Sequence, residues 1–499
     1  MSDATPTPDV TDVLDATGAG DRVIAGGTLR ILFYALGSLF AVGSTAFVSR
    51  HLGIQAFDGF VTVLSLTAVA LLVTDFGLAA LGVREYVARS GEDRDHVMGV
   101  LVALRLSLMV VATLAMVVFA LLSGFSSTLL VGTVVAGVGL IVQAVPATYS
   151  LPLAATLRLG WVGAIDFIRQ AVQALVLMAL VLVGAGTVPL LGSLVPAGVV
   201  SLIVAAAVAR SLAPLWPRWD WREMGRLLRM ALSYAIGTSI GAIYAYVAQI
   251  VTHLATTEYE SGLFALSFRV FSVIIAVAII AVGSAYPVLT RAAGNDASRF
   301  GYAGTRLYEG IVLIGVLAGV GVGVASPAII EVLGGPAFRD AVDVARLHAA
   351  AIPGSFAVAA GSFLLLATRQ HKTLLWINVS ILLVSIALTA VAASTWGATG
   401  SAAAMVVTEY TLAFAFFVAI RRQSSGIGFG LRPLLSLLTA VAAAVIVAAL
   451  LSALAGGIAW SVAWSLAACA VFTLVALSTG GVPPEIIGLV RARLGRPAA

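Results

Sequence analysis

Residues 315–325 read GVLAGVGVGVA, a run without a single charged side chain, and about a dozen comparable apolar blocks lie along the chain. Of the 499 residues, 61% are hydrophobic and only 10% are charged, and the mean hydropathy is +1.07. A soluble domain carries about 25% charged residues, so this chain cannot cover its surface with polar side chains. The composition therefore predicts a polytopic membrane protein.

The apolar blocks have the length of membrane spans, because roughly 20 helical residues cross a bilayer core. Windows of that length predict fourteen spans, near 27–48, 57–81, 97–122, 127–147, 162–184, 187–209, 230–253, 260–288, 306–330, 342–367, 373–393, 397–420, 432–455 and 458–479. Helices satisfy their backbone hydrogen bonds within one segment, whereas a barrel would show short alternating strands. The expected fold class is all-α, with about fourteen transmembrane helices.

Basic residues are distributed unevenly between the loops. Of the 28 arginines and lysines, 23 fall on the side that holds both termini and three fall on the opposite side, while Arg105 and Arg269 lie inside spans. The positive-inside rule therefore places both termini in the cytoplasm. The sequence pI near 9.5 follows from this topology, so no nucleic-acid binding is expected.

An internal repeat aligns two parts of the chain at an offset of 202 residues. His51–Asp58 lies over His253–Glu260, and the match continues at Leu64-Ser65 over Leu266-Ser267. Six spans separate the copies, so both have the same orientation, as in transporters built from parallel repeats. The expected organisation is a disordered cytoplasmic tail (1–26), an N-lobe of six helices (27–210), an amphipathic cytoplasmic linker (211–229), a C-lobe of six helices (230–422), a C-terminal helical pair (432–479) and a cytoplasmic tail (480–499).

Several turn segments resemble those of the polysaccharide-transporter family, the Wzx-type flippases of lipid-linked oligosaccharides. That family belongs to the multidrug/oligosaccharidyl-lipid/polysaccharide exporter superfamily. The resemblance covers roughly residues 25–425, with the segments in the usual order and spacing. The segments that carry it are Ser49–Gly53 with Phe57–Phe60, Thr74–Leu78 with Arg84 and Glu85, Leu333–Phe338 with Ala341, Leu366–Lys372, and Trp396–Ala403.

The resemblance implies two lobes around a central cavity that opens alternately to either side of the membrane. The implied function is transfer of a polyprenyl-pyrophosphate-linked oligosaccharide from the cytoplasmic to the outer leaflet of a bacterial inner membrane, for surface polysaccharide assembly. A polar path between the lobes would remove the cost of carrying a charged head group through hydrocarbon. The implied partners are membrane lipids and, beyond the substrate itself, a polysaccharide polymerase or glycosyltransferases.

Ionisable side chains inside spans are costly, and they are therefore candidates for function. Arg269 and Arg105 lie about 13 and 12 Å deep, and their guanidinium forks suit a pyrophosphate. Arg50, at the outer end of the first span, is a third candidate for substrate binding. Asp75 and Glu409 could take part in ion coupling, or they could instead form structural pairs with Arg105 and Arg269.

Other functions fit the same composition. A cation-coupled multidrug exporter of the MATE kind and a lipid II flippase are the transporter alternatives. A membrane-embedded glycosyltransferase is less favoured, because the outer loops of about a dozen residues or fewer leave no room for a catalytic domain, so no enzymatic activity is expected. The chain contains no ATP-binding phosphate loop, and Cys469 is its only cysteine, so no cofactor or metal is expected. His51 and His253 are expected to be exposed and uncommitted.

Overall fold

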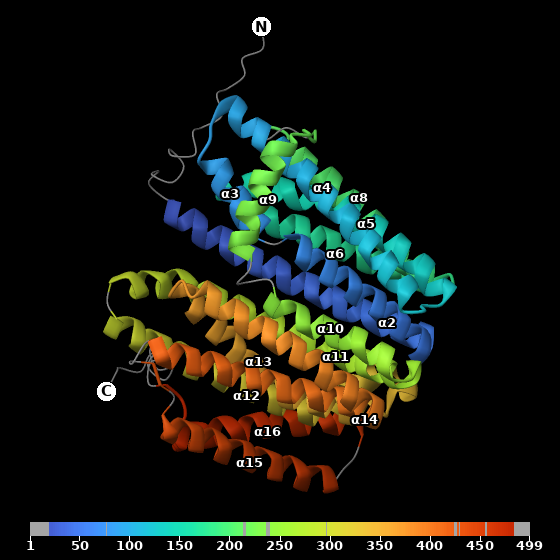
Figure 1. Ribbon diagram of the computed structural model, residues 1–499. Coiled ribbons are helices and arrows are strands. Elements are labelled where there is room, and N and C mark those ends of the chain that lie inside the picture. The colour runs from blue at the N-terminus through green and yellow to red at the C-terminus, as the bar shows by residue number, and fades with distance from the viewer. Residues whose placement is uncertain are drawn as a thin grey trace. The chain divides into compact units, whose positions relative to one another are not determined.

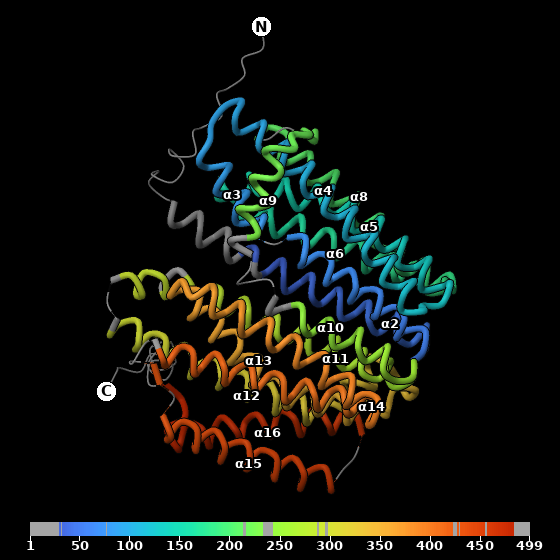
Figure 2. The backbone as a smooth tube through the Cα atoms, viewed as in Figure 1, coloured from blue at the N-terminus to red at the C-terminus, as the bar shows by residue number. Residues whose placement is uncertain are grey.

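Long helices carry almost all of the chain in the computed structural model (Figure 1). The structure describes residues 19–75, 77–212, 216–235, 240–295, 297–423, 427–428, 430–454 and 457–483, and every regular element among them is helical. Two compact units divide the chain, residues 1–250 and residues 251–499. Figure 2 follows the same path as a tube, from blue at the start to red at the end.

Helices α2 to α10 begin in the first unit. Their bounds are α2 (Ala19–Asp75), α3 (Leu78–Val87), α4 (Gly91–Leu122), α5 (Ser127–Ala155), α6 (Leu159–Leu182), α7 (Thr187–Gly192), α8 (Leu194–Ala209), α9 (Trp221–Ala235) and α10 (Ile240–Ala255). The second unit contains α11 (Glu258–Asn295), α12 (Ala297–Gly334), the short 3₁₀ turn Pro336–Phe338, α13 (Ala341–Ala367), α14 (His371–Gln423), α15 (Leu431–Leu454) and α16 (Ile458–Ser478).

Two helices are too long for a single crossing of a bilayer. Eleven described helices are long and apolar enough to span a membrane, and two of these segments, 32–87 and 371–422, have 56 and 52 residues. Each is interrupted: α2 has a left-handed residue at Gly53 (φ 71°) and α14 has one at Gly397 (φ 58°). Because each break divides a segment into two crossings, these helices, together with the shorter α10, match the fourteen predicted spans.

Left-handed turns recur in the two units at nearly constant offsets, which exceed the 202-residue offset of the sequence repeat by 9 to 11 residues. Pairs of residues with positive φ lie 211, 212 and 213 residues apart, and these pairs are Gly124 with Gly335, Leu157 with Arg369, and Gly184 with Gly397. A positive φ is uncommon for residues other than glycine, so the leucine–arginine pair is the more informative. Sequence identity at these sites is low, and the backbone conformation is what the two units share.

The turns at Leu157 and Arg369 are closed by the same hydrogen bonds. In each, the preceding threonine donates its hydroxyl to two carbonyls of the helix before it: Thr156 to Pro152 and Leu153, and Thr368 to Leu364 and Leu365. The backbone N–H groups that follow also bond back to the last helical turn in both units. Such bonds satisfy the carbonyls at a helix end, and they appear at equivalent positions.

The two units are built around tightly packed helix interfaces. In the first unit, α3, α4, α5 and α9 share a buried cluster that includes Leu81, Met98, Leu151 and Leu227. In the second unit, α12 packs against α15 and α16, where small residues let the helices approach closely. The hydroxyl of Ser465 on α16 donates to the Gly321 carbonyl of α12 at 2.8 Å, a type of interhelical bond common in membrane bundles.

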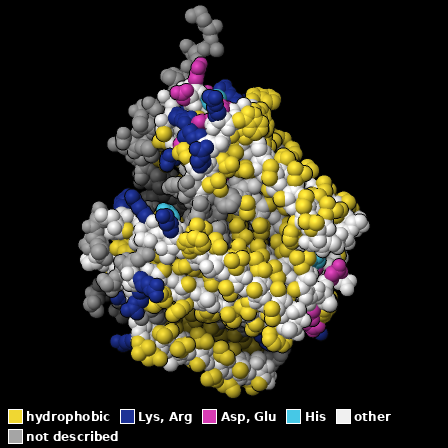
Figure 3. All heavy atoms as spheres, viewed as in Figure 1, with side chains coloured by type: hydrophobic (Ala, Val, Ile, Leu, Met, Phe, Trp, Pro, Cys, Tyr) yellow, Lys and Arg dark blue, Asp and Glu magenta, His cyan; other side chains and the backbone are white. Residues whose placement is uncertain are grey.

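Large apolar side chains remain exposed along the outer faces of the helices. Leu122, Leu182 and Leu454 are 84%, 82% and 79% exposed. On the face drawn in Figure 3, apolar side chains cover most of the length of the helices, and charged side chains gather near helix ends. Surfaces of this kind are stable against lipid and not against water, so the fold is that of an all-helical polytopic membrane protein.

The boundary between the units falls after Ile250, within α10, and not in the linker 211–229 that the sequence analysis placed between the lobes. Contacts inside the first unit account for this position. Ile250 packs in a cluster with Leu66 of α2, Met109 of α4 and Leu140 of α5, and the neighbouring Gln249 donates to the Asp58 carboxylate of α2 at 3.3 Å. The first part of α10 therefore belongs to the first unit.

Candidate functional site

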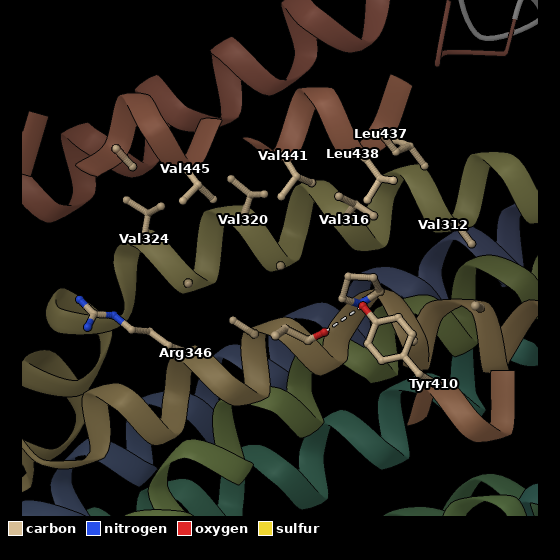
Figure 4. Close-up of a pocket in the computed structure, with 18 of the residues that line it drawn as sticks. Val312, Val316, Val320, Val324, Arg346, Tyr410, Leu437, Leu438, Val441 and Val445 are labelled. Atoms are coloured by element: carbon tan, nitrogen blue, oxygen red, sulfur yellow. Dashed lines mark hydrogen bonds between the residues drawn. The ribbon is translucent and has the colours of Figure 1, made fainter. Parts of the chain in front are cut away.

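An apolar groove runs along the second unit between α12, α13, α14, α15 and α16 (Figure 4). It has a volume of about 1010 Å³. One wall is a row of valines on α12 at every fourth position: Val312, Val316, Val320 and Val324. Residues four apart lie on one face of a helix, so this row forms a continuous apolar strip. The lining includes Leu437, Leu438, Val441 and Val445 of α15, which Figure 4 shows beside the same row.

The groove is as long as a bilayer core is thick. Its lining on α12 extends from Tyr308 to Pro327, which corresponds to about 28 Å at 1.5 Å per residue. The α13 wall of the groove includes Gly354 and Ala357, which project little into the groove because their side chains are small. The hydroxyl of Tyr410, the polar group nearest the middle, donates to the Ala350 carbonyl at 3.1 Å (Figure 4). The middle of the groove is therefore suited to a hydrocarbon chain.

Apart from Tyr410, the polar side chains of this lining lie toward its two ends. At one end are the Arg346 guanidinium, the hydroxyls of Ser452 and Ser461, and Trp464. At the other end are the Tyr308 and Phe417 rings, whose centroids are 6.1 Å apart, and the Arg421 guanidinium lies 5.8 Å from the Phe417 ring. The groove is therefore apolar in the middle and has an arginine near each end, of which Arg346 pairs with Asp343 at 2.9 Å and Arg421 lies outside the described lining.

None of the five residues predicted as site residues from the sequence lies in the described lining of this groove. Arg105 and Asp75 are brought together in the first unit, where the Arg105 guanidinium donates to the Asp75 carboxylate. The Arg105 side chain is 5% exposed and the Asp75 side chain is 43% exposed. The structural pair that the sequence analysis named as the alternative for Arg105 is therefore formed. The pair engages the guanidinium that was the candidate for substrate binding.

The other three predicted residues lie on separate helices. Arg50 is exposed on α2, just before the break at Gly53. Arg269 is half-buried on α11, and Glu409 is fully buried on α14. The Glu409 backbone passes so close to α13 that a β-carbon on Gly354 would lie 3.0 Å from the Glu409 Cβ. Their roles in substrate binding or ion coupling remain predictions.

A buried carboxylate that the sequence analysis left without a role is Asp58 of α2. It is 0% exposed and accepts hydrogen bonds from the Thr62 hydroxyl at 3.4 Å and from the Gln249 amide at 3.3 Å. Its place in the repeated His51–Asp58 segment was a signal that could have identified it. His51 is exposed as expected, but it is not uncommitted, because its Nε2 donates to the Ala185 carbonyl at 2.8 Å and so fixes the turn after α6.

The repeat-equivalent carboxylate in the second unit, Glu260, also fixes a turn. It accepts the backbone N–H of Ala398 at 2.9 Å, at the start of the second half of α14. Gly397 precedes this bond with φ 58°, and a β-carbon there would lie 2.5 Å from the Glu260 carboxylate. Both the positive φ and the close approach therefore require glycine. Each copy of the repeated segment thus fixes a left-handed turn of its own unit. In the first unit His51 binds just after Gly184, and in the second Glu260 binds just after Gly397.

A ring of four charged side chains holds α9 against α3. Glu85 and Glu223 each contact both Arg89 and Arg226, at distances between 2.6 and 3.1 Å. The Glu85 side chain is only 7% exposed. Beneath the ring, apolar side chains of α9, among them Leu227, pack into the cluster of α3, α4 and α5. The apolar face of α9 is therefore covered by protein.

Hydrogen bonds also fix the start of α9. The Asp220 carboxylate accepts the backbone N–H groups of Glu223 and Arg222 and contacts His96 of α4 at 3.2 Å. The bond from Glu223 is the largest cause that lowers the pKa of Asp220 below its ordinary value. Hydrogen bonds from Arg226 and then Arg89 lower the pKa of Glu223, and the same pairing raises the pKa of Arg226. Three exposed tryptophans flank this start: Trp216, Trp219 and Trp221.

Replacing Glu223 with glutamine is expected to lower the stability of the protein at pH 7, by about 1 kcal/mol for a charge network of this kind. Because folding lowers the pKa of Glu223, the carboxylate stabilises the protein above its unfolded pKa, near 4.3. That contribution is lost as the pH falls through the folded value. Thermal unfolding of both proteins in detergent should therefore differ at pH 7 and converge only once the pH has fallen below the lowered, folded-state pKa of Glu223.

The control for this prediction is Glu92→Gln, since Glu92 is an exposed carboxylate in the first turn of α4. It should leave the unfolding temperature unchanged at both pH values. A Glu223→Gln protein that is as stable as the original at pH 7, or a difference that persists at acid pH, would show that the ring contributes nothing to the attachment of α9.

Several solved structures share the architecture described above. No family model matches the chain, and no curated protein matches it in sequence. Among solved structures, the lipid II flippase MurJ in an inward closed conformation has a TM-score of 0.75 at 12% identity, over 89% of this chain and 98% of that chain. An inward-facing multidrug resistance MATE family transporter of the MOP superfamily has a TM-score of 0.63 at 14% identity, over 80% and 98%.

A third structure, a MOP superfamily transporter from Pyrococcus furiosus, has a TM-score of 0.59 at 14% identity, over 84% of this chain and 99% of that chain. The chain has the MOP superfamily fold. The resemblance noted in the sequence is confirmed at the level of this superfamily's fold and no finer. At such identities the likeness is one of fold, and the groove in the second unit carries the argument about function.

Proposed function

We propose that this protein is a flippase that moves a polyprenyl-pyrophosphate-linked oligosaccharide from the cytoplasmic to the outer leaflet by alternating access. The observation that carries the proposal is the groove. A chain in the groove would exchange lipid contacts for contacts with the valines of α12 and the apolar side chains of α15. Exposing one CH₂ group of the polyprenyl chain to water costs about 0.8 kcal/mol. The polyprenyl chain must therefore stay out of water during transfer, and a groove of bilayer length allows this.

The fold agrees with this cargo and with the exporter alternative alike, because a solved lipid II flippase and solved MATE transporters both have it. The remaining features follow from the proposal: location in a bacterial inner membrane, both termini in the cytoplasm, and work alongside a polysaccharide polymerase or glycosyltransferases. Arg269 is the preferred ligand for the pyrophosphate, and Arg50 is the next candidate. Arg105 is a weaker candidate, since its guanidinium already pairs with Asp75.

One observation favours a second candidate, a cation-coupled exporter of the MATE kind. Glu409 and Asp58 are fully buried carboxylates in membrane-spanning helices, and such groups can bind a coupling proton or sodium ion. An exporter of compact cationic drugs, however, has no need of an apolar groove about 28 Å long. We therefore rank this function below the flippase.

Deletion of the gene tests the proposal in cells. The flippase predicts that lipid-linked oligosaccharide accumulates on the cytoplasmic leaflet and that a surface glycan is depleted. Complementation with the original gene should reverse both effects. A surface glycan at its normal level, together with raised sensitivity to cationic drugs, would instead identify the exporter.

A further inference from the structure

A histidine is buried in the second unit, outside the described lining of the groove. His348 of α13 is 2% exposed, and its Nδ1 lies 2.6 Å from the Ser267 hydroxyl of α11. Three rings on the same face of α11, Phe264, Phe271 and Phe268, have centroids 4.9, 5.3 and 6.4 Å from the imidazole centroid. One serine and three aromatic rings thus enclose an ionisable side chain within a membrane span.

The second ring nitrogen of His348 is the unusual feature of this enclosure. Its Nε2 is buried and has no hydrogen-bond partner among the residues that the structure describes. A neutral imidazole carries its hydrogen on one nitrogen. If that nitrogen is Nε2, a buried donor is unsatisfied, and if it is Nδ1, Nε2 is a bare basic nitrogen. Buried polar atoms nearly always have partners, and an exception calls for an explanation.

Among the residues that the structure describes, no charged side chain forms a hydrogen bond with His348 that would explain the unpaired nitrogen. The hydrogen bond and the ring contacts of His348 all involve neutral side chains. On its own helix, the nearest charged side chains in sequence are Asp343 and Arg346. The helices packed against α13 carry charged or titratable side chains toward the same end or the middle: Glu260 and Arg269 on α11, Glu331 on α12, and Glu409 and Tyr410 on α14.

We infer that Nε2 of His348 is a proton-binding site that couples proton movement to transport, an inference that rests on the proposed function. Ser267 can serve both forms of the ring, because its hydroxyl donates to a bare Nδ1 and accepts from Nδ1–H of the imidazolium. The rings of Phe264 and Phe271 lie within the roughly 6 Å at which an aromatic ring can attract a cation. The proton binds to the Nε2 lone pair and later leaves from the same atom, so no other bond changes.

Burial links this proton to a conformational change. In the enclosed arrangement Nε2 is out of reach of solvent, so a proton can enter or leave only when α11 and α13 separate or rotate. A site that exchanges its proton in one conformation and not in another shifts the balance between the two conformations with pH. Ser267 is the positioning residue of this site, since it holds the ring through Nδ1.

Transport under an imposed pH difference tests the inference. The probe is a polyprenyl-diphosphate disaccharide in proteoliposomes that contain the full chain. A difference of one pH unit is expected to change the rate of the original protein severalfold, with an upper limit of about tenfold for one coupled proton. His348→Gln should show no response. His371→Gln should respond like the original protein, because His371 is exposed at the start of α14. Ser267→Ala should respond weakly, and Ser267→Thr should recover the response.

Nitrogen-15 spectra of the histidine side chains provide a readout that does not depend on transport. The chain has five histidines, and the signal absent from His348→Gln identifies His348. Because burial among neutral side chains disfavours the imidazolium, Nε2 should be neutral in the enclosed arrangement and should take up a proton when binding of the probe opens it. A His348 that stays neutral throughout, or a His348→Gln protein that responds to the pH difference, would overturn the inference. Failure of the original protein to move the probe would count against the flippase instead, and the spectra would still decide the proton site.

Discussion

Replacing Val445 with tryptophan is expected to abolish most transport, because the indole would fill the groove beside Val320 and Val324. Val445 lines the groove from α15 and is itself 53% exposed, so the larger side chain can be accommodated without disturbing the core. A displaced length of two to three CH₂ groups, at about 0.8 kcal/mol each, should weaken lipid binding by tenfold or more. Binding of a radiolabelled polyprenyl-diphosphate sugar to the purified protein measures this directly.

The adjacent residue provides the control. Ile446 is 59% exposed on α15 and does not belong to the described lining of the groove. Ile446→Trp adds the same side chain to the same helix, one residue away and on a different face. It should leave binding and transport within about twofold of the original protein, since exposed substitutions are usually within 0.5 kcal/mol. Equal losses in both variants would mean that the groove is not the lipid site.

Replacing Arg269 with alanine is expected to abolish transport while leaving the amount of folded protein unchanged. A half-buried guanidinium on α11 can hold a pyrophosphate through two parallel hydrogen bonds, and a charge-assisted bond of this kind is worth about 1.5–3 kcal/mol. Arg269→Lys should recover only part of the rate, because an ammonium group cannot reproduce the fork. Transport assays and the yield of monodisperse protein in detergent provide the two measurements.

The alternative for Arg269 is a structural pair with the buried Glu409. In that case Arg269→Ala would leave a buried carboxylate uncompensated, and the fold would lose about 3–5 kcal/mol. The double variant Arg269→Ala with Glu409→Ala separates the two roles. If Arg269 binds substrate, the double variant remains inactive. Recovery of both protein yield and transport in the double variant would refute substrate binding by Arg269.

The fold was largely predictable from the sequence, because lipid imposes its constraints on every span. Uninterrupted apolar blocks of about twenty residues located the helices. The pair of Arg105 and Asp75 followed from an arginine and a carboxylate at similar depth on neighbouring spans, and the structure forms it. The attachment of α9 was less predictable. The sequence indicated only an amphipathic cytoplasmic linker at 211–229, and the ion pairs with Glu85 depend on tertiary contacts.

The groove could not be predicted, for a physical reason. Its lining comes from five helices and consists mostly of valine, leucine and alanine, the same residue types that face lipid elsewhere. Nothing in the sequence distinguishes Val445, which lines the groove, from Ile446, which does not. The role of His51 was missed for a related reason, because its partner is a backbone carbonyl 134 residues away, and backbone groups leave no sequence signal.

Translocation by the purified protein in proteoliposomes tests the central claim most directly. A polyprenyl-diphosphate disaccharide is placed in one leaflet, and a membrane-impermeant glycosidase added to the opposite side reports its arrival; a cationic dye is tested in parallel as an exporter substrate. The flippase predicts that the disaccharide lipid crosses much faster than in protein-free vesicles, that Val445→Trp slows it while Ile446→Trp does not, and that the dye is not moved. Transport of the dye without transport of the lipid would contradict the proposed function.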